Sequence, residues 1–286
     1  MLKECIDSLL NQSFPLKKIV VVNSNSTDGT NEMLKQYVPY VKIIDGFNTW
    51  WWAKCMNAGI TYSLENGADY ILAMNDDTCL DYYCLEYLID TSRSFPEVIV
   101  GSIVKDKQFN GKIINQGIGA KYTKFRWIPF KKVLGNVNGR EVFYTEGHSG
   151  RGVIFPVSVY KHVGLYDDLN FPQHADRDYS YRCLKLGVGQ CIDSHAVTFL
   201  NFNTTQFGMS EARLTFAEIK NVLFNVKGIY NLKNQFRFLR KHYSFLWPFW
   251  FALWLAYISV VIITRMLPGG TLIIRKFTNS YFYVFK

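Results

Sequence analysis

The stretch that decides the fold is residues 69–78, DYILAMNDDT, in which an apolar run ends in Asn75-Asp76-Asp77. Residues 69–74 are typical of a buried strand. In open α/β sheets, ligands bind beyond the carboxyl ends of the strands. Two adjacent carboxylates there repel each other and favour a divalent cation such as Mg²⁺ or Mn²⁺, which takes oxygen ligands and completes its shell with phosphates and water. An Asp-Asp pair can equally begin a solvated turn, so the dipeptide alone leaves both interpretations open.

Around this stretch, strand-like and helix-like patterns alternate along the chain. Strands are expected at residues 18–22, 41–44 and 69–74, and helices at 2–10, 53–64, 158–163 and 177–186. This alternation predicts an α/β fold with a parallel sheet. From residue 98 to residue 155, short strand-like runs separated by Gly, Asn and Lys predict mixed or antiparallel structure added to the first half.

Five segments, taken in order, resemble the inverting family 2 glycosyltransferases. They are residues 18–30 (KIVVVNSNSTDGT), 48–60 (NTWWWAKCMNAGI), 70–78 (YILAMNDDT), 150–156 (GRGVIFP) and 171–182 (FPQHADRDYSYR). Within that family, the segments resemble the rhamnosyltransferase-like enzymes of surface polysaccharide assembly. The resemblance implies a GT-A fold, which is Rossmann-like with a mostly parallel central sheet and helices on both faces. It also implies that a sugar is transferred from a nucleotide diphosphate sugar with inversion at the anomeric carbon.

The resemblance further implies roles for residues in the first three segments. Asp77 would hold the metal, and Asp76 would contribute to the metal or lie near the ribose or diphosphate. A metal held there could stabilise the charge on the leaving nucleoside diphosphate as a Lewis acid. The other residues expected to bind the donor are Asn23, Ser26, Asp28 and Asn57.

Asp176 and Asp178 are the candidates for the general base that the acceptor hydroxyl needs. Both open the helix predicted at residues 177–186, where the helix dipole favours the ionised form. Motif position matches Asp176 to the family's base, although either residue could instead be an N-cap without chemistry. Arg182 could orient a carboxylate, contact the diphosphate or form a surface ion pair.

Two further sets of side chains are weaker candidates. Trp51 and Trp52 could line the donor or acceptor pocket, because aromatic faces suit sugar C–H surfaces, but they could equally pack in the core. His195 could be a third metal ligand, although the family pattern would place that histidine near Leu200 or Asn201. His148 and His174 are expected to be structural.

The sequence departs from the family pattern at two places. Asn23 stands where the family usually has an aspartate that contacts the nucleoside. Met1 falls inside the first predicted helix, whereas the family has a strand before it. We therefore expect a missing first strand, through a truncated sequence or a misplaced start codon, and two exposed strand edges. Both departures support an alternative function, a catalytically inactive GT-A-like membrane scaffold or sugar-nucleotide-binding protein. A dehydrogenase is disfavoured because no G-x-G-x-x-G follows a strand.

The charge is distributed unevenly along the 286 residues. Residues 213–286 hold 11 of the 32 basic side chains and one of the 23 acidic ones, for a net +10, which leaves 21 against 22, or −1, in residues 1–212. We therefore expect a glycosyltransferase domain at residues 1–212 and a basic, aromatic, membrane-associated helical tail at residues 213–286. A nucleic-acid partner is not expected, because no nucleic-acid-binding module accompanies the basic residues.

Residues 243–264 form an uncharged run flanked by Arg240-Lys241 and Arg265. The run is long enough to cross a bilayer. Pro248 and the density of aromatic residues favour a monotopic hairpin or an in-plane helix, with a single span or a buried helix as the alternatives. Such a tail predicts an enzyme at the cytoplasmic face of a membrane, acting on a glycan or a lipid-linked glycan acceptor. The six cysteines form no C-x-x-C pair and are expected to be buried thiols.

Overall fold

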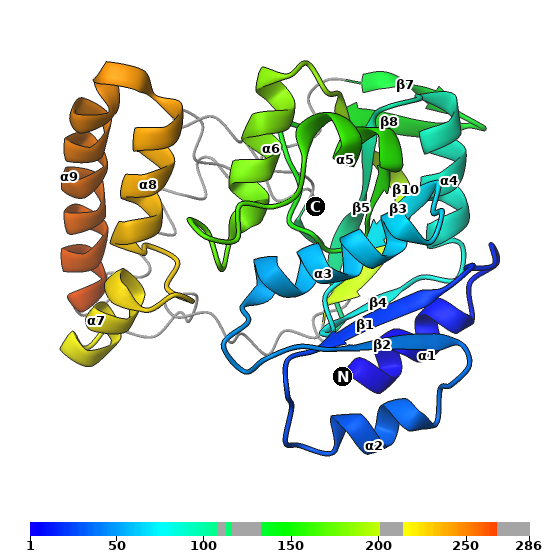
Figure 1. Cartoon of the computed structure of the whole chain (residues 1–286). Coiled ribbons are helices and arrows are strands. Elements are labelled where there is room, and N and C mark those ends of the chain that lie inside the picture. The colour runs from blue at the N-terminus through cyan, green and yellow to red at the C-terminus, as the bar shows by residue number, and fades with distance from the viewer. Residues whose placement is uncertain (108–112, 116–132, 201–213, 268–286) are drawn as a thin grey trace. The chain divides into compact units, whose positions relative to one another are not determined.

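The computed structural model describes residues 1–107, 113–115, 133–200 and 214–267, and divides the chain into two compact units, Met1–Phe202 and Asn203–Lys286 (Figure 1). The boundary predicted at residues 212 and 213 lies outside the described residues. We describe each unit by itself.

The first unit alternates helices and strands in its first half and is rich in strands afterwards. Its helices are α1 (Leu2–Leu10), α2 (Thr30–Lys35), α3 (Trp52–Glu65), α4 (Cys84–Ser94), α5 (Val157–Val163) and α6 (Ala175–Lys185). Its strands are β1 (Ile19–Asn23), β2 (Val41–Asp45), β3 (Tyr70–Ala73), β4 (Thr78–Leu80), β5 (Ile99–Asp106), β6 (Ile113–Asn115), β7 (Val133–Val137), β8 (Arg140–Tyr144), β9 (Val153–Pro156) and β10 (Gln190–Leu200).

The strands form two sheets, which confirm an α/β fold but not a mostly parallel sheet. β1 and β2 pair in parallel by themselves. The larger sheet has the order β3-β9-β5-β10-β8-β7, with β4 on β10 and β6 on β5, and only its β5–β10 pair is parallel. The sheet is mixed because β9 returns antiparallel between β3 and β5, and because β7 and β8 form a hairpin. Asn138 and Gly139 at the hairpin tip both have positive φ, as a two-residue loop requires.

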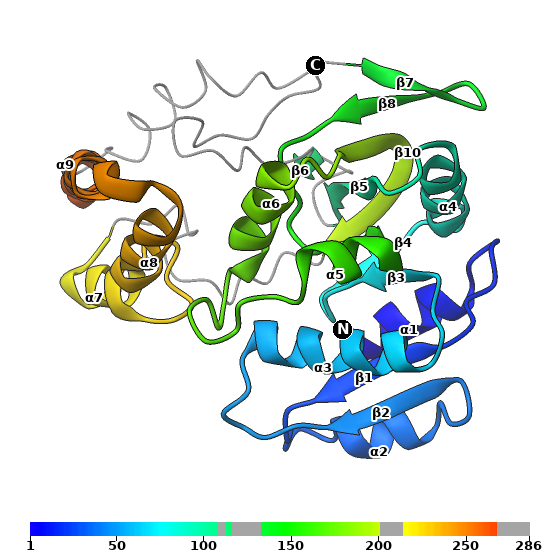
Figure 2. The ribbon, with the colours of Figure 1, turned by 45° about the horizontal axis from the view of Figure 1, so that its top comes forward.

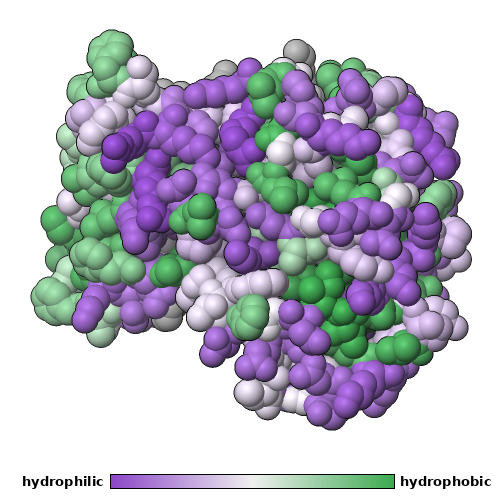
Figure 3. All heavy atoms as spheres, viewed as in Figure 1, coloured by the Kyte–Doolittle hydropathy of each residue, from purple (hydrophilic) through white to green (hydrophobic). Residues whose placement is uncertain are grey.

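The two sheets are separated between β1 and β3. Among the described residues, β1 pairs only with β2, and β3 pairs only with β9. α3 bridges the interval, because it packs against both β1 and β3. Figure 3 shows hydrophobic residues at the surface between α3 and β1. The missing first strand stays a prediction.

Helices cover both faces of the larger sheet, as predicted. On one face, Ile6 of α1 and Leu88 of α4 share a core with Val100 and Ile154 of the sheet. On the other face, the ring of Phe155 in β9 lies 5.2 Å from Tyr160 of α5 and 5.9 Å from Tyr179 of α6. α4 and α5 lie on opposite sides of the strands in Figure 2. All six cysteines are free, and all but Cys55 are buried, as predicted.

His148 is buried against the sheet and is structural. A Cβ on Gly101 would lie 2.6 Å from His148 Cε1, so only glycine lets the imidazole pack this closely on β5. Burial lowers the pKa of His148 to about 3, and a hydrogen bond with the backbone of Ile99 opposes this shift. The imidazole is therefore neutral at pH 7.

We expect His148 to make the protein less stable as the pH falls below about 6.5, the ordinary pKa of histidine. Between that pH and about 3, the unfolded chain binds a proton that the folded chain excludes, so the free energy of unfolding falls with pH. At pH 5 the loss is about 2 kcal/mol. Urea unfolding at pH 7 and pH 5 should show a smaller loss for His148→Gln than for wild type. Equal losses would contradict this assignment.

The second unit consists of α7 (Phe216–Phe224), α8 (Leu232–His242), a short 3₁₀ helix (Ser244–Leu246) and α9 (Trp247–Met266). α8 and α9 lie side by side (Figure 1), and Phe236 of α8 contacts Trp247 and Phe251 of α9. Pro248 does not interrupt α9. It stands in the first helical turn, where the missing backbone N–H costs no hydrogen bond.

Candidate functional site

The predicted site begins where β3 ends. Ala73 pairs with Val153 at the start of the antiparallel strand β9, and the N–H of Gly152 donates to the Ala73 carbonyl at 3.1 Å. This register places the loop after β3, which carries Asp76 and Asp77, beside the loop before β9, which carries Arg151.

Asp77 is the half-buried carboxylate of the pair, whereas Asp76 is exposed. Burial raises the pKa of Asp77, the guanidinium of Arg151 opposes that shift, and Asp76 adds to it. The buried Oδ1 of Asp77 has no hydrogen-bond partner among the described residues. An unsatisfied buried carboxylate oxygen is an expensive feature unless something else binds it.

Trp52 holds the loop after β3 in place from the first residue of α3. Its Nε1–H donates to Asn75 Oδ1 at 2.9 Å, and its ring lies 5.2 Å from that of Tyr166. A Cβ on Gly150 would lie 2.9 Å from Trp52 Cζ2. Trp52 thus contacts three segments of the site at once. Trp51 is different, because 40% of it is exposed.

Asn57 and Arg182 fix the segment between α5 and α6. The amide of Asn57 donates to the Tyr166 carbonyl at 2.9 Å and accepts from the Tyr166 N–H at 3.0 Å. Arg182 donates to Asp178 at 3.0 Å and to the carbonyls of Val163 and Leu165 at 2.8 and 2.7 Å. Of the roles considered for Arg182, the structure shows the one in which it orients a carboxylate, that of Asp178.

Asp176 and Asp178 stand in the first turn of α6 but in different surroundings. Asp178 is fully buried in its ion pair with Arg182. Asp176 is half-buried, and its Oδ1 accepts from the N–H of Arg177 at 2.9 Å. Burial raises the pKa of Asp176, while His174, that hydrogen bond and Arg151 oppose the shift. The positive charge of Arg151 therefore opposes the rise in pKa of both Asp77 and Asp176, which indicates that it lies near both.

The polar turn after β1 is ordered by its own side chains. Asn23 is buried, donates to Asn31 Oδ1 at 2.6 Å, and accepts from the N–H of Ser26 at 3.1 Å. Asp28 is exposed and accepts from the hydroxyl of Thr30 at 2.6 Å. In this structure, Asn23 therefore shapes the turn that carries Ser26 and Asp28.

His195 is not brought to Asp77. The register of β10 with β4 places Leu200 opposite Thr78, and His195 stands five residues earlier, roughly 16 Å along the strand. Its ring instead lies 6.3 Å from that of Tyr87 on α4.

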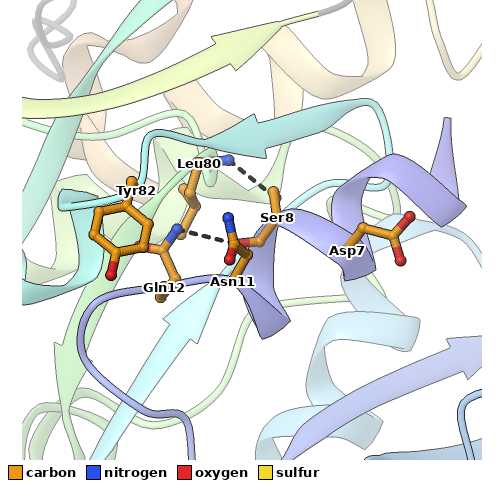
Figure 4. Close-up of a pocket in the computed structure, with 6 residues that line it drawn as sticks. All are labelled: Asp7, Ser8, Asn11, Gln12, Leu80 and Tyr82. Carbon is orange, nitrogen blue, oxygen red and sulfur yellow. Dashed lines mark hydrogen bonds between the residues drawn. The ribbon is translucent and has the colours of Figure 1, made fainter.

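A cavity of about 410 Å³ beside α1 is separate from these groups. Its lining residues, drawn in Figure 4, are Asp7, Ser8, Asn11, Gln12, Leu80 and Tyr82. Within its wall, the Leu80 N–H donates to Ser8 Oγ at 3.1 Å, and Gln12 donates to the Ser8 carbonyl at 2.9 Å. None of the predicted site residues lines this cavity.

The residues after β3 fit a divalent cation. The supporting observation is the buried, unpartnered carboxylate oxygen of Asp77, which is the kind of ligand that Mg²⁺ and Mn²⁺ prefer. The described residues contain no group of three or more His, Cys, Asp or Glu side chains that could hold a metal.

Sequence reasoning assigned no role to Arg151, and left open whether Trp52 faces a pocket or the core. The only signal for Arg151 was its position in Gly150-Arg151-Gly152. Nothing in the sequence indicated that Trp52 would donate to Asn75, because the two residues meet only in the folded chain.

Comparisons with known proteins agree with this architecture. Poly-beta-1,6-N-acetyl-D-glucosamine synthase of Staphylococcus epidermidis is 22% identical over 169 residues, which are 58% of this chain and 38% of that protein. The chain thus spans well under half the length of this curated relative. A crystal structure of GalNAc-T7 with UDP, GalNAc and Mn²⁺ has a TM-score of 0.58 at 12% identity, over 86% of this chain and 50% of that one.

The structure of S. aureus TarS has a TM-score of 0.53 at 16% identity, over 85% of this chain and 41% of that one. These two likenesses show a GT-A-like fold. The model of the family described as "Glycosyl transferase family 2" matches residues 1–153, more than half of the 286 residues. The chain therefore belongs to glycosyl transferase family 2.

Proposed function

We propose that this glycosyltransferase moves a sugar from a nucleotide diphosphate sugar to a glycan or lipid-linked glycan, with inversion, in surface polysaccharide synthesis. The observation that carries the proposal is the buried, unpartnered carboxylate oxygen of Asp77 in the loop after β3, beside the loop that carries Arg151. The relative named as a polysaccharide synthase supports the class of product.

Different residues of the chain bind the metal, accept the proton and position the loops. Asp77, with Asp76 beside it, would hold Mg²⁺ or Mn²⁺, which as a Lewis acid lowers the energy of the leaving diphosphate. Asp176 takes the proton of the acceptor hydroxyl. Because burial raises its pKa, it is a stronger base than an ordinary aspartate. Trp52 bonds to Asn75 in the loop that carries Asp77, and Asn57 bonds to Tyr166 in the segment that precedes α6 and Asp176.

A donor screen tests the proposal. The full-length protein is mixed with Mn²⁺ and a panel of nucleotide sugars, and release of the nucleoside diphosphate is measured with and without glycan acceptors. We expect turnover with at least one donor. Binding of a nucleotide sugar without turnover on any acceptor would instead support a sugar-nucleotide-binding protein.

We also propose that the second unit holds the enzyme at the cytoplasmic face of a membrane. Residues Ser244–Met266 form a helical segment whose mean hydropathy of 2.0 and length suffice to cross a bilayer. An outward face of α9 is apolar and exposed, at Phe249, Leu253, Tyr257, Val260 and Ile263 (Figure 3). The neighbouring helix α8 carries Lys233, Arg237, Arg240 and Lys241.

This arrangement favours a monotopic attachment. Because α8 packs along α9, a spanning α9 would draw the basic side chains of α8 towards the hydrocarbon, where they are costly. With both helices in the plane of the membrane, α9 reaches the acyl chains and α8 meets anionic headgroups.

A charge on the exposed face of α9 should release the protein from membranes. We expect Val260→Asp to weaken binding to vesicles that contain anionic lipid by about 2.5 kcal/mol, nearly a hundredfold. Co-sedimentation measures the change. The control is Leu10→Asp, at an exposed residue of α1 in the other unit, which should bind like wild type. Undiminished sedimentation of Val260→Asp would contradict the attachment through α9.

A further inference from the structure

Arg151 is held in one backbone conformation by the glycines on both sides. Gly150 and Gly152 have φ values of 61° and 67°, in the left-handed region that favours glycine. A Cβ on Gly152 would also overlap the hydroxyls of Thr198 and Ser102. Ser102 Oγ in turn contacts Thr198 Oγ1 at 2.6 Å and donates to the carbonyl of Arg151 at 3.4 Å. The main chain of Arg151 is therefore fixed to β5 and β10.

The side chain of Arg151 differs from those of Arg140 and Arg182 in the same unit. Arg140 is paired with Asp193 at 3.1 Å and Arg182 with Asp178 at 3.0 Å, each within hydrogen-bond distance. Arg151 Nε is buried and has no hydrogen-bond partner among the described residues. A buried guanidinium N–H without an acceptor is costly in the free protein, and indicates that the acceptor is a ligand.

The charges around Arg151 indicate which kind of ligand this is. Asp77 lies in the loop beside the one that carries Arg151, and it is also expected to hold the cation. A nucleoside diphosphate carries more negative charge than one divalent cation neutralises. A rigid guanidinium beside the cation site supplies the missing positive charge and presents parallel N–H donors that match phosphate oxygens.

We propose that Arg151 binds the diphosphate of the donor and stabilises the charge that this group gains on leaving. The inference rests on the proposed function and adds a residue to it. In the reaction, the acceptor oxygen forms the bond to the anomeric carbon and its proton passes to Asp176. The bond from that carbon to the phosphate oxygen breaks, and its electron pair stays on the diphosphate, beside Arg151.

Calorimetry on the full-length protein in detergent tests the proposal without relying on turnover. The probes are UDP, dTDP and inorganic pyrophosphate, each with Mn²⁺, and Mn²⁺ alone. For Arg151→Gln we expect about 10- to 100-fold weaker binding of the diphosphates, the range of one charge-assisted hydrogen-bond pair. Binding of Mn²⁺ alone should not weaken, because the variant removes a positive charge near Asp77.

Two variants accompany Arg151→Gln. Arg93→Gln removes an exposed guanidinium on α4 and should bind the diphosphates like wild type. Arg151→Lys keeps the positive charge but not the paired N–H donors of the guanidinium, so its affinity for the diphosphates should lie between those of wild type and Arg151→Gln. It also keeps the test valid if the glutamine variant does not fold.

The outcomes separate the two proposals. If Arg151→Gln binds the diphosphates as tightly as the wild-type protein does, the role of Arg151 is overturned and the proposed function still stands. A wild-type protein that binds none of the three diphosphates with Mn²⁺ would contradict the proposed function, and the role of Arg151 with it.

Discussion

Replacing Asp77 with alanine is expected to reduce sugar transfer by about a thousandfold or more, because it removes the one half-buried carboxylate of the predicted cation site. The remaining neighbour, Asp76, is exposed and cannot supply the same oxygen. The loss should appear in kcat at saturating Mn²⁺, and Mn²⁺ binding alone should weaken with it. Steady-state kinetics and calorimetry with Mn²⁺ measure the two effects.

The matched control is Asp69→Asn, which removes an exposed aspartate next to the opposite end of β3. It should leave both transfer and Mn²⁺ binding unchanged. Folding is not expected to limit the Asp77 variant, since the buried Oδ1 makes no hydrogen bond within the described residues. An Asp77→Ala protein with undiminished turnover would contradict the assignment of the cation site.

Replacing Asp176 with asparagine is expected to lower kcat by about 10²- to 10⁴-fold, the usual contribution of a general base. Binding of UDP or dTDP with Mn²⁺ should remain, because the base acts on the acceptor and not on the nucleotide. This split between kcat and nucleotide binding distinguishes Asp176 from Asp77. Loss of nucleotide binding in Asp176→Asn would place Asp176 in the donor site instead.

Asp178→Asn provides the comparison two residues along α6. This substitution weakens a buried ion pair with Arg182, so it should cost about 3 kcal/mol of stability. Transfer by the fraction that remains folded should be less affected than in Asp176→Asn. Thermal melts and specific activity measure the two effects. The reverse pattern, a stable but inactive Asp178→Asn, would identify Asp178 as the base.

The pH dependence of kcat also tests whether Asp176 is the general base. A base must be deprotonated to act, so the rate falls as the pH drops through the pKa of Asp176. Because burial raises that pKa, the fall should lie at a higher pH than for an ordinary aspartate.

The sequence predicted those parts of the molecule that depend on local pattern. The apolar run that ends in Asp76-Asp77 is β3 followed by a loop, and the amphipathic run at residues 2–10 is α1. The order of the strands could not be predicted, because nothing in the local sequence indicates that β9 returns antiparallel beside β3. The β4 strand was not predicted, because three residues are too few to show an alternating pattern.

The roles of single polar side chains were the hardest to predict. Asn57, which is predicted to bind the donor, also bonds to the backbone of Tyr166, which is 109 residues away. His195 stands five residues short of the strand end at Leu200. The partner of Asn57 comes from a distant segment, which local spacing does not indicate, whereas for His195 the family pattern already placed the ligand nearer Leu200.

Metal-dependent transfer by the full-length protein is the decisive test of its proposed function. Nucleoside diphosphate release is measured from a panel of nucleotide sugars with a glycan acceptor, first with Mn²⁺, then after chelation with EDTA, then with Mn²⁺ restored. We predict turnover with at least one donor, its loss on chelation and its return with the metal. No turnover with any donor, together with no Mn²⁺-dependent binding of UDP or dTDP, would contradict the account and identify an inactive scaffold.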